Sequence, residues 1–224
     1  MDLSYLILIV PTLLLSMWAQ FKVKSTFDKY SKVQCSQGIT GVAAAALLMR
    51  VNNISDVKVE AVSGSLTDHY DPSAKKLRLS EPVYGSATIA AVGVAAHETG
   101  HAIQHAVKWG PLVMRSTLVP AANIGSSFGP TLAIAGLVLS FPALINIGII
   151  LFSGAVLFYV VTLPVEFNAS SRAIAILRAN NVLTNEELKG VKKVLSAAAM
   201  TYVASALTAV ANLLRLVLLS RRRR

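Results

Sequence analysis

The chain has 224 residues, of which 54% are hydrophobic and 14% are charged, and this is far too apolar for an ordinary soluble domain. We therefore expect an integral membrane protein. The formal net charge is +10, but the basic residues flank apolar segments and form no stripe interleaved with aromatic residues, which argues against a nucleic-acid partner. The single cysteine, Cys35, excludes an intrachain disulfide and a cysteine-based zinc site.

Residues 3–19 form an uncharged apolar run that is interrupted only by Pro11 and is long enough to cross a bilayer. No lysine or arginine precedes the run and no clear cleavage site follows it, so we predict a retained span and not a secretory signal. Four lysines follow between positions 22 and 32, whereas Asp2 alone precedes the span. The positive-inside bias then places the N-terminus outside and residues 20–116 in the cytoplasm.

The segment after the first span predicts a small α+β region. Residues 38–51 predict a short helix, and residues 57–62 alternate at period two, as a half-buried strand does. Residues 66–71 and 77–80 predict a hairpin around Asp71-Pro72-Ser73. An edge strand here could hold an extended peptide by backbone pairing, or the hairpin could be purely structural.

A helix is predicted after Ser86, which is a plausible N-cap, and Trp109-Gly110-Pro111 should end it. This helix contains His97-Glu98-Thr99-Gly100-His101, and residues four apart lie on one face about one turn up. His97 and His101 could therefore bind a single metal ion, and Glu98 beside them could take a proton from a metal-bound water. The alternative is that these are solvent-facing polar residues of a helix.

Two uncharged apolar stretches follow, at residues 117–139 and 143–163, joined by Ser140-Phe141-Pro142. They predict a transmembrane hairpin. Two crossings return the chain to the side that it left, so residues 164–193 should share a compartment with the motif helix. Pro164 suits the first turn of a new helix that runs to about residue 180.

The last helix should open with a capping box at Thr184-Asn185-Glu186-Glu187. Its residues 194–219 are apolar except for Arg215 and are long enough to cross. Crossing would put Arg215 and four terminal arginines outside, against sixteen basic residues inside, namely eleven in 20–116 and five in 164–193. We expect this helix to cross, and the alternative is that it packs along the other helices without fully crossing.

A catalytic zinc usually takes three protein ligands and keeps one position for water. His105 lies about 12 Å along a continuous helix from His97, too far to bind the same ion, so we expect it to support a ligand or to face an interface. His69 on the hairpin is another option, although a lone histidine there is more often a surface residue. Glu166 is the better third ligand, because it is the only acidic residue between positions 99 and 185 and should lie at the membrane boundary.

The motif followed by Glu166-Phe167-Asn168-Ala169-Ser170 resembles membrane zinc peptidases of the HtpX and CAAX prenyl protease type, whose downstream glutamate is the third zinc ligand. Over nearly the whole chain, the sequence is more similar to the YugP-like neutral zinc metallopeptidases, at residues 66–72, 79–84 and 164–167 as well as the motif. This resemblance implies a zinc-dependent endopeptidase of a prokaryotic cell membrane. Ser170 stands where the HtpX-type motif has an aspartate that orients a zinc-ligating histidine, and it could still donate a hydrogen bond.

We therefore predict a mainly α integral membrane protein that forms one metallopeptidase domain over 1–224. It should have about four transmembrane helices and a small cytoplasmic α+β metalloprotease region made of a short sheet and the motif helix. Its reaction would be peptide-bond hydrolysis at a zinc ion, and a further donor would stabilise the oxyanion. The expected site comprises the ligands His97, His101 and Glu166, the base Glu98, the supporting residue Ser170, and the oxyanion candidates Tyr84, His105 and Arg172.

Two other functions are weighed against this one. A site-2-type intramembrane protease would supply its third ligand from an Asp-Gly pair, and the chain contains no Asp-Gly. A membrane scaffold or assembly factor with a structural zinc would use the same ligands but would not need Glu98. For the peptidase, we expect the lipid bilayer and a peptide or membrane-protein substrate as partners, with a homo-oligomer left open. The expected location is the inner membrane of a prokaryote, with the active site on the cytoplasmic side.

Overall fold

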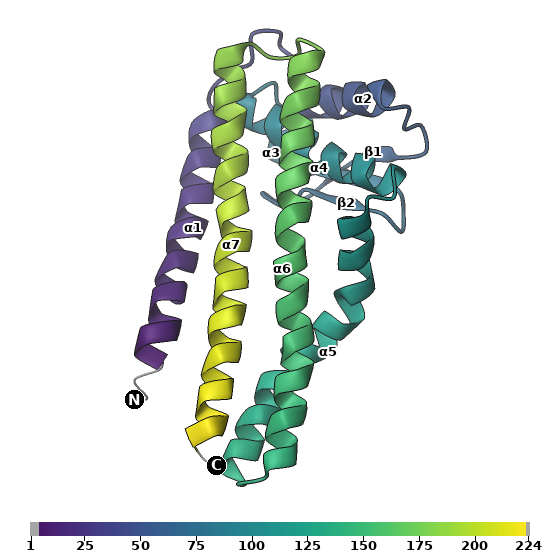
Figure 1. Ribbon diagram of the computed structural model, residues 1–224. Coiled ribbons are helices and arrows are strands. Elements are labelled where there is room, and N and C mark those ends of the chain that lie inside the picture. Colours follow the sequence, from purple (N-terminus) through teal and green to yellow (C-terminus); the bar gives the residue numbers. More distant parts are fainter. Residues whose placement is uncertain (1–4, 223–224) are drawn as a thin grey trace. The chain divides into compact units, whose positions relative to one another are not determined.

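The computed structural model describes residues 5–222 (Figure 1) and is mainly helical. It divides into two compact units. Unit 1 takes in Gly110–Pro164 and the described parts of Met1–Gln20 and Met200–Arg224, and unit 2 takes in Phe21–Trp109 and Val165–Ala199.

Four helices are long and apolar enough to cross a membrane. They are α1 (Val10–Tyr30) with the π-helical turn η1 (Tyr5–Ile9) before it, α5 (Gly110–Val138), α6 (Pro142–Ala179) and α7 (Asn185–Arg222). The prediction of about four membrane-spanning helices is thus confirmed at the level of length and composition. Arg223 and Arg224 of the basic tail lie outside the described residues.

In unit 1, α5 and α6 form the predicted helical hairpin, and Ser140 turns the chain between them with a positive φ of 52°. Small residues let the two backbones approach closely, as is common between membrane helices. A Cβ added to Gly129 would lie 2.7 Å from the Phe152 Cβ, and one added to Gly136 would lie 2.7 Å from the Ile145 nitrogen. The glycines on α5 therefore determine how closely it packs on α6.

Unit 2 contains a three-stranded sheet in the order β1-β3-β2. β1 (Lys58–Val62) pairs parallel with β3 (Lys76–Ser80), and β2 (His69–Asp71) pairs antiparallel with β3. The predicted strand at 57–62 and the predicted hairpin are confirmed, although β2 begins three residues later than expected. β2 is an edge strand and contacts the motif helix α4.

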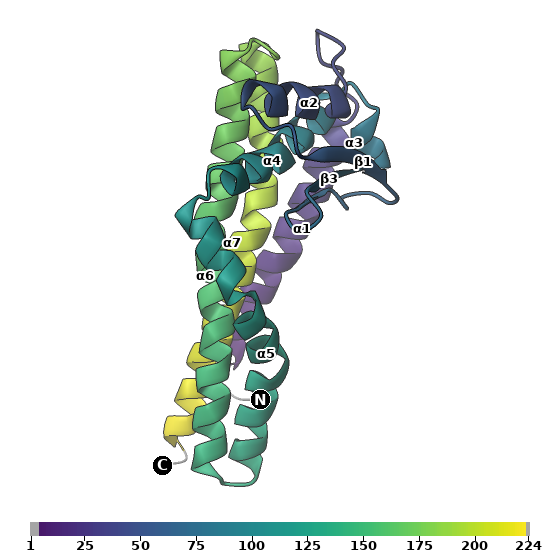
Figure 2. The ribbon, with the colours of Figure 1, turned by 90° about the vertical axis from the view of Figure 1, so that its right-hand side faces the viewer.

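Three shorter helices contact the sheet and lie beside it (Figure 2). α2 (Gly41–Val51) is capped by Thr40, α3 (Glu81–Tyr84) follows β3, and α4 (Ile89–Ala106) carries the motif. The N-cap of α4 is Thr88 and not Ser86, so that prediction was wrong by two residues. The buried Thr88 hydroxyl accepts a hydrogen bond from the Ala91 amide at 3.3 Å, which satisfies a first-turn donor.

Pro164 does not begin a new helix, contrary to the prediction, because α6 runs unbroken from Pro142 to Ala179 with Pro164 inside it. Proline removes one backbone donor, but the residues around it bury one continuous face that includes Val161, Val165 and Ala169. Packing of this face outweighs the lost hydrogen bond. α7 is also continuous from its capping box, where the Thr184 amide donates to Glu187 at 2.7 Å and the Glu187 amide donates to Thr184 at 3.3 Å.

The core of unit 2 forms around α4, whose small residues allow close contacts. Ala91 and Ala95 pack with Leu77 and Leu79 of β3, and Val92 packs in a second cluster with residues of α2, α6 and α7. Gly100 meets α6 most closely, since a Cβ there would lie 2.6 Å from the Ala169 carbonyl oxygen. This contact brings the motif of α4 against the segment of α6 that contains Glu166.

Candidate metal centre

Three potential metal ligands converge where α4 meets α6. The Nε2 atoms of His97 and His101 lie 3.3 Å and 3.5 Å from the Glu166 Oε2 atom, and the three ligand atoms all lie within 4.8 Å of one another. The helical spacing of four places both imidazoles on the same face of α4. The Glu166 side chain is only 3% exposed, so its carboxylate is held away from bulk water among nitrogen atoms.

The other nitrogen of each imidazole also has a partner. The His97 Nδ1 lies 3.1 Å from the Ser170 hydroxyl, and the His101 Nδ1 lies 3.0 Å from the Gln104 Oε1. Such contacts fix the orientation of a metal-binding imidazole and leave Nε2 to face the ion. Here both Nε2 atoms face Glu166.

The donor set suits zinc. Two imidazole nitrogens and one carboxylate oxygen are typical ligands of a catalytic zinc ion, which keeps a further position for water. Burial lowers the pKa of His101, but its hydrogen-bond contacts with Glu166 and Gln104 and the negative charges of Glu98 and Glu166 together raise that pKa more, so the net shift is upward. Because a histidine binds zinc through an unprotonated nitrogen, protons compete with the metal for His101, and zinc binding should weaken in acid.

Glu98 lies beside the three ligands but is not one of them. Its Oε2 atom accepts a hydrogen bond from the Tyr70 backbone amide of β2 at 3.1 Å. The Tyr70 hydroxyl lies 2.8 Å from the Nδ1 of His105, which is about two turns after Glu98 on α4. The edge strand therefore holds the carboxylate through a backbone amide, and His105 holds the side chain of the same tyrosine.

The comparisons with known proteins agree with this donor set. Residues 5–221 match the family described as "putative neutral zinc metallopeptidase". The chain belongs to this family. It is also 52% identical over 215 residues to the "Putative membrane protease YugP" of Bacillus subtilis (strain 168), which covers 96% of each chain. No solved structure matches the chain. Zinc is the cofactor of this family, and the histidine–histidine–glutamate group could hold it.

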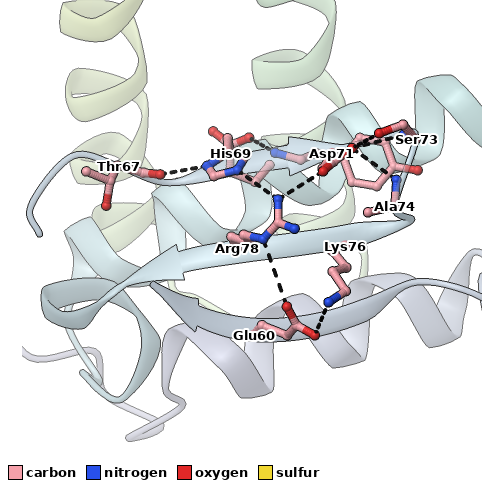
Figure 3. A network of polar contacts seen from close by, with 10 residues as sticks. Glu60, Thr67, His69, Asp71, Ser73, Ala74, Lys76 and Arg78 are labelled. Carbon is pink, nitrogen blue, oxygen red and sulfur yellow. Dashed lines mark hydrogen bonds and ion pairs between the residues drawn. The ribbon is translucent and has the colours of Figure 1, made fainter. Parts of the chain in front are cut away.

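The two remaining histidines, His69 and His105, make other contacts. His69 lies on the sheet (Figure 3), where its Nδ1 is 2.8 Å from the Thr67 carbonyl oxygen and its Nε2 is 3.2 Å from the Arg78 guanidinium. His105 contacts Tyr70, as given above. Neither belongs to the described group that could hold a metal.

The other residues expected at the site differ in how directly they contact the candidate ligands. Ser170 contacts a candidate ligand directly. The Arg172 Nε donates to the Asn168 Oδ1 at 2.7 Å, and that oxygen also accepts from the Gln104 Nε2 at 3.1 Å. Tyr84 lies in α3 and packs against the hydrophobic cluster around Leu77, and within residues 5–222 it makes no hydrogen bond to the candidate ligands.

Sequence reasoning missed Gln104 and Tyr70. Gln104 had a detectable signal, because it lies three residues after His101 on the same face of an otherwise apolar helix, where a buried amide needs partners. Tyr70 had none, since its backbone amide meets Glu98 only through the pairing of β2 beside α4.

Proposed function

We propose that this protein is a membrane-embedded zinc endopeptidase. The observation that carries the proposal is the convergence of the His97 Nε2, the His101 Nε2 and the Glu166 Oε2 within 4.8 Å, beside the separate carboxylate of Glu98. Three ligands leave room for water and substrate, whereas a structural zinc site is usually closed by four protein ligands. Glu98 is not one of the three candidate ligands and is therefore available for proton transfer.

Each residue has a distinct task in this proposal. A zinc ion held by the two histidines and Glu166 would lower the pKa of water and polarise a peptide carbonyl. Glu98 accepts a proton as water attacks the carbonyl carbon, and then delivers that proton to the leaving amine nitrogen when the C–N bond breaks. The Tyr70 amide keeps Glu98 aimed during both transfers. His105, Arg172 and Tyr84 remain the candidates for a donor to the oxyanion.

The substrate class is inferred from the sequence around Glu166, which follows the predicted end of the span at Leu163 by three residues. A site so close to the end of an apolar span favours membrane proteins or membrane-associated peptides as substrates. The four lysines between positions 22 and 32 favour the cytoplasmic side of a prokaryotic inner membrane.

The test of the catalytic role is Glu98→Gln. Glutamine keeps the size of the side chain and an acceptor for the Tyr70 amide but cannot take a proton. We expect peptide hydrolysis to fall about 10²- to 10⁴-fold while the purified protein still binds about one zinc per chain. Comparative proteomics of membranes from cells with wild type or Glu98→Gln should show uncleaved membrane proteins with the variant. Equal hydrolysis by both proteins would remove Glu98 from the mechanism, and a wild type without hydrolysis would favour a structural zinc.

The test of the ligand set compares Glu166→Ala with His105→Ala. Loss of a ligand should leave protein that is zinc-poor at trace metal, whereas loss of a supporting contact typically costs about 10- to 100-fold in affinity or activity. Both variants are first compared with wild type by circular dichroism and thermal unfolding, because Glu166 is buried between helices. Loss of zinc from His105→Ala together with retention by Glu166→Ala would overturn the proposed ligand set.

A further inference from the structure

Gln104 is a fully buried side chain of α4, and both ends of its amide have partners. Its Oε1 lies 3.0 Å from the His101 Nδ1. Its Nε2 lies 2.8 Å from the Val165 carbonyl oxygen and 3.1 Å from the Asn168 Oδ1, both on α6. A buried amide that satisfies both ends in this way links one candidate ligand to the helix that carries another.

The chemistry of these partners allows only one direction for the hydrogen bonds. The Val165 carbonyl oxygen can accept but not donate, so the NH₂ end of Gln104 must face it. The Arg172 Nε can donate but not accept, so the atom of Asn168 that it contacts must be the oxygen, and this oxygen suits the same NH₂ group. The Gln104 oxygen is therefore left facing His101.

An oxygen in that place requires a donor on the ring. The His101 Nδ1 must carry a proton, and in a neutral imidazole the Nε2 then keeps a lone pair. His97 differs, because its partner is the Ser170 hydroxyl, which can donate or accept and so selects neither tautomer.

We propose that Gln104 is a positioning residue that fixes His101 in the Nδ1–H tautomer and thereby presents its Nε2 lone pair to the metal. The Val165 carbonyl, Asn168 and Arg172 act behind it by fixing the direction of the Gln104 amide. The proposal rests on the proposed function only in taking His101 as a zinc ligand, and it does not require peptide hydrolysis. A metal ion then meets a ring that is already in the binding tautomer.

The first experiment measures zinc affinity by chelator competition on detergent-purified full-length protein. Gln104→Met keeps a similar length and removes every hydrogen bond, and we expect about 10- to 100-fold weaker zinc binding. Gln37→Met is the matched control, because Gln37 is exposed and donates to the Asn181 carbonyl far along the chain from the ligands. Asn168→Ala leaves the Val165 carbonyl to orient Gln104 and should cost less than Gln104→Met. Unchanged affinity in Gln104→Met would overturn the proposal.

The second experiment reads the tautomer directly in the wild-type protein. The chain has four histidines, so ¹⁵N-histidine spectra of the protein in micelles can be assigned with His69→Gln, His105→Gln and, in the metal-free state, His97→Gln. In zinc-loaded wild type, we expect a protonated His101 Nδ1 and a metal-shifted Nε2. In metal-free protein at a pH where imidazoles are neutral, wild type should show the Nδ1–H tautomer of His101. Gln104→Met should shift toward the Nε2–H tautomer, because Glu166 is then the hydrogen-bond acceptor that remains for the ring. Binding of zinc through Nδ1, or a neutral Nε2–H tautomer in wild type, would refute the role of Gln104.

The two proposals fail in different ways. A protein that binds zinc through the His101 Nε2 but hydrolyses no peptide would contradict the peptidase and leave the role of Gln104 intact. Peptide hydrolysis that depends on Glu98, with His101 in the Nε2–H tautomer, would support the peptidase and refute the role of Gln104.

Discussion

Gly100 lies between the two histidines of the motif, and the substitution Gly100→Ala tests whether the close contact of α4 with α6 forms the metal centre. A Cβ at this position would lie 2.6 Å from the Ala169 carbonyl oxygen and 3.1 Å from its carbonyl carbon. These atoms belong to the backbone of α6, so no side-chain rotation can relieve the overlap. The two helices must move apart.

The size of the effect follows from the distance. Ordinary contact begins near 3.4 Å, so the helices must separate by about 0.8 Å at this point. Alanine gains about 1 kcal/mol over glycine in a helix, whereas overpacking typically costs about 1–3 kcal/mol, so the free energy of unfolding should fall by about 0–2 kcal/mol. The site should suffer more, because a misplacement of about 1 Å can cost about 10²-fold in rate.

Gly93→Ala on the same helix is the matched control. It brings the same gain in helix propensity, but the nearest atoms to its Cβ would be side-chain carbons of Val191, the first at 3.2 Å, and not backbone atoms. Thermal unfolding, zinc affinity and peptidase activity of the two variants are compared with wild type. We expect Gly93→Ala to match wild type and Gly100→Ala to bind zinc at least about tenfold more weakly. If the two variants behave alike, the Gly100 contact does not determine how Glu166 meets the histidines.

Three further predictions concern other parts of the chain. Asp71→Asn should make the free energy of unfolding depend less on pH below about pH 4. Hydrogen bonds from Ser73 and its neighbours hold the pKa of Asp71 below its usual value, so the ionised carboxylate stabilises the wild type above that range and this stabilisation is lost as pH falls. Acid unfolding of wild type and variant measures the difference. In a variant without the native cysteine, a cysteine at Lys75 should label from the cytoplasm and one at Phe141 from the other side, and labelling of both from one side would contradict the hairpin. Tyr70→Phe should lower kcat several-fold, because it loses the hydroxyl contact with His105, which is worth about 0.5–1.5 kcal/mol. The zinc content should stay at the wild-type level. A loss of zinc would show that this tyrosine supports the ligands instead.

Much of the fold could be predicted from local patterns. The apolar runs predicted four helices of membrane-spanning length, because a bilayer demands length and hydrophobicity that can be counted along the chain. The strand at 57–62 and the hairpin around Asp71-Pro72-Ser73 followed from period-two alternation and turn residues. The capping box at Thr184 and Glu187 was also correct, since its contacts lie within one helical turn.

The candidate site was predictable as far as its residues lie on one helix. A spacing of four places His97 and His101 on one face in any α-helix, and the intervening sequence cannot change that. Glu166 could be chosen only by elimination and by the resemblance to known peptidases. Its distances of 3.3 Å from the His97 ring and 3.5 Å from the His101 ring join positions that are 69 and 65 apart in the sequence, which local pattern does not describe.

Tertiary structure alone decided the rest, because contacts between distant segments have no local signature. It kept α6 continuous through Pro164, where the burial of one face outweighed the preference of proline for a helix start. It paired β1 with β3 and so left β2 at the edge, where the Tyr70 amide meets Glu98. It also brought the Val165 carbonyl within 2.8 Å of Gln104, and this contact sets the direction of the hydrogen bonds that end at His101. The sequence determined which side chains could bind a metal ion and which could take a proton from water. The packing of α4 on α6 determined how these side chains face one another.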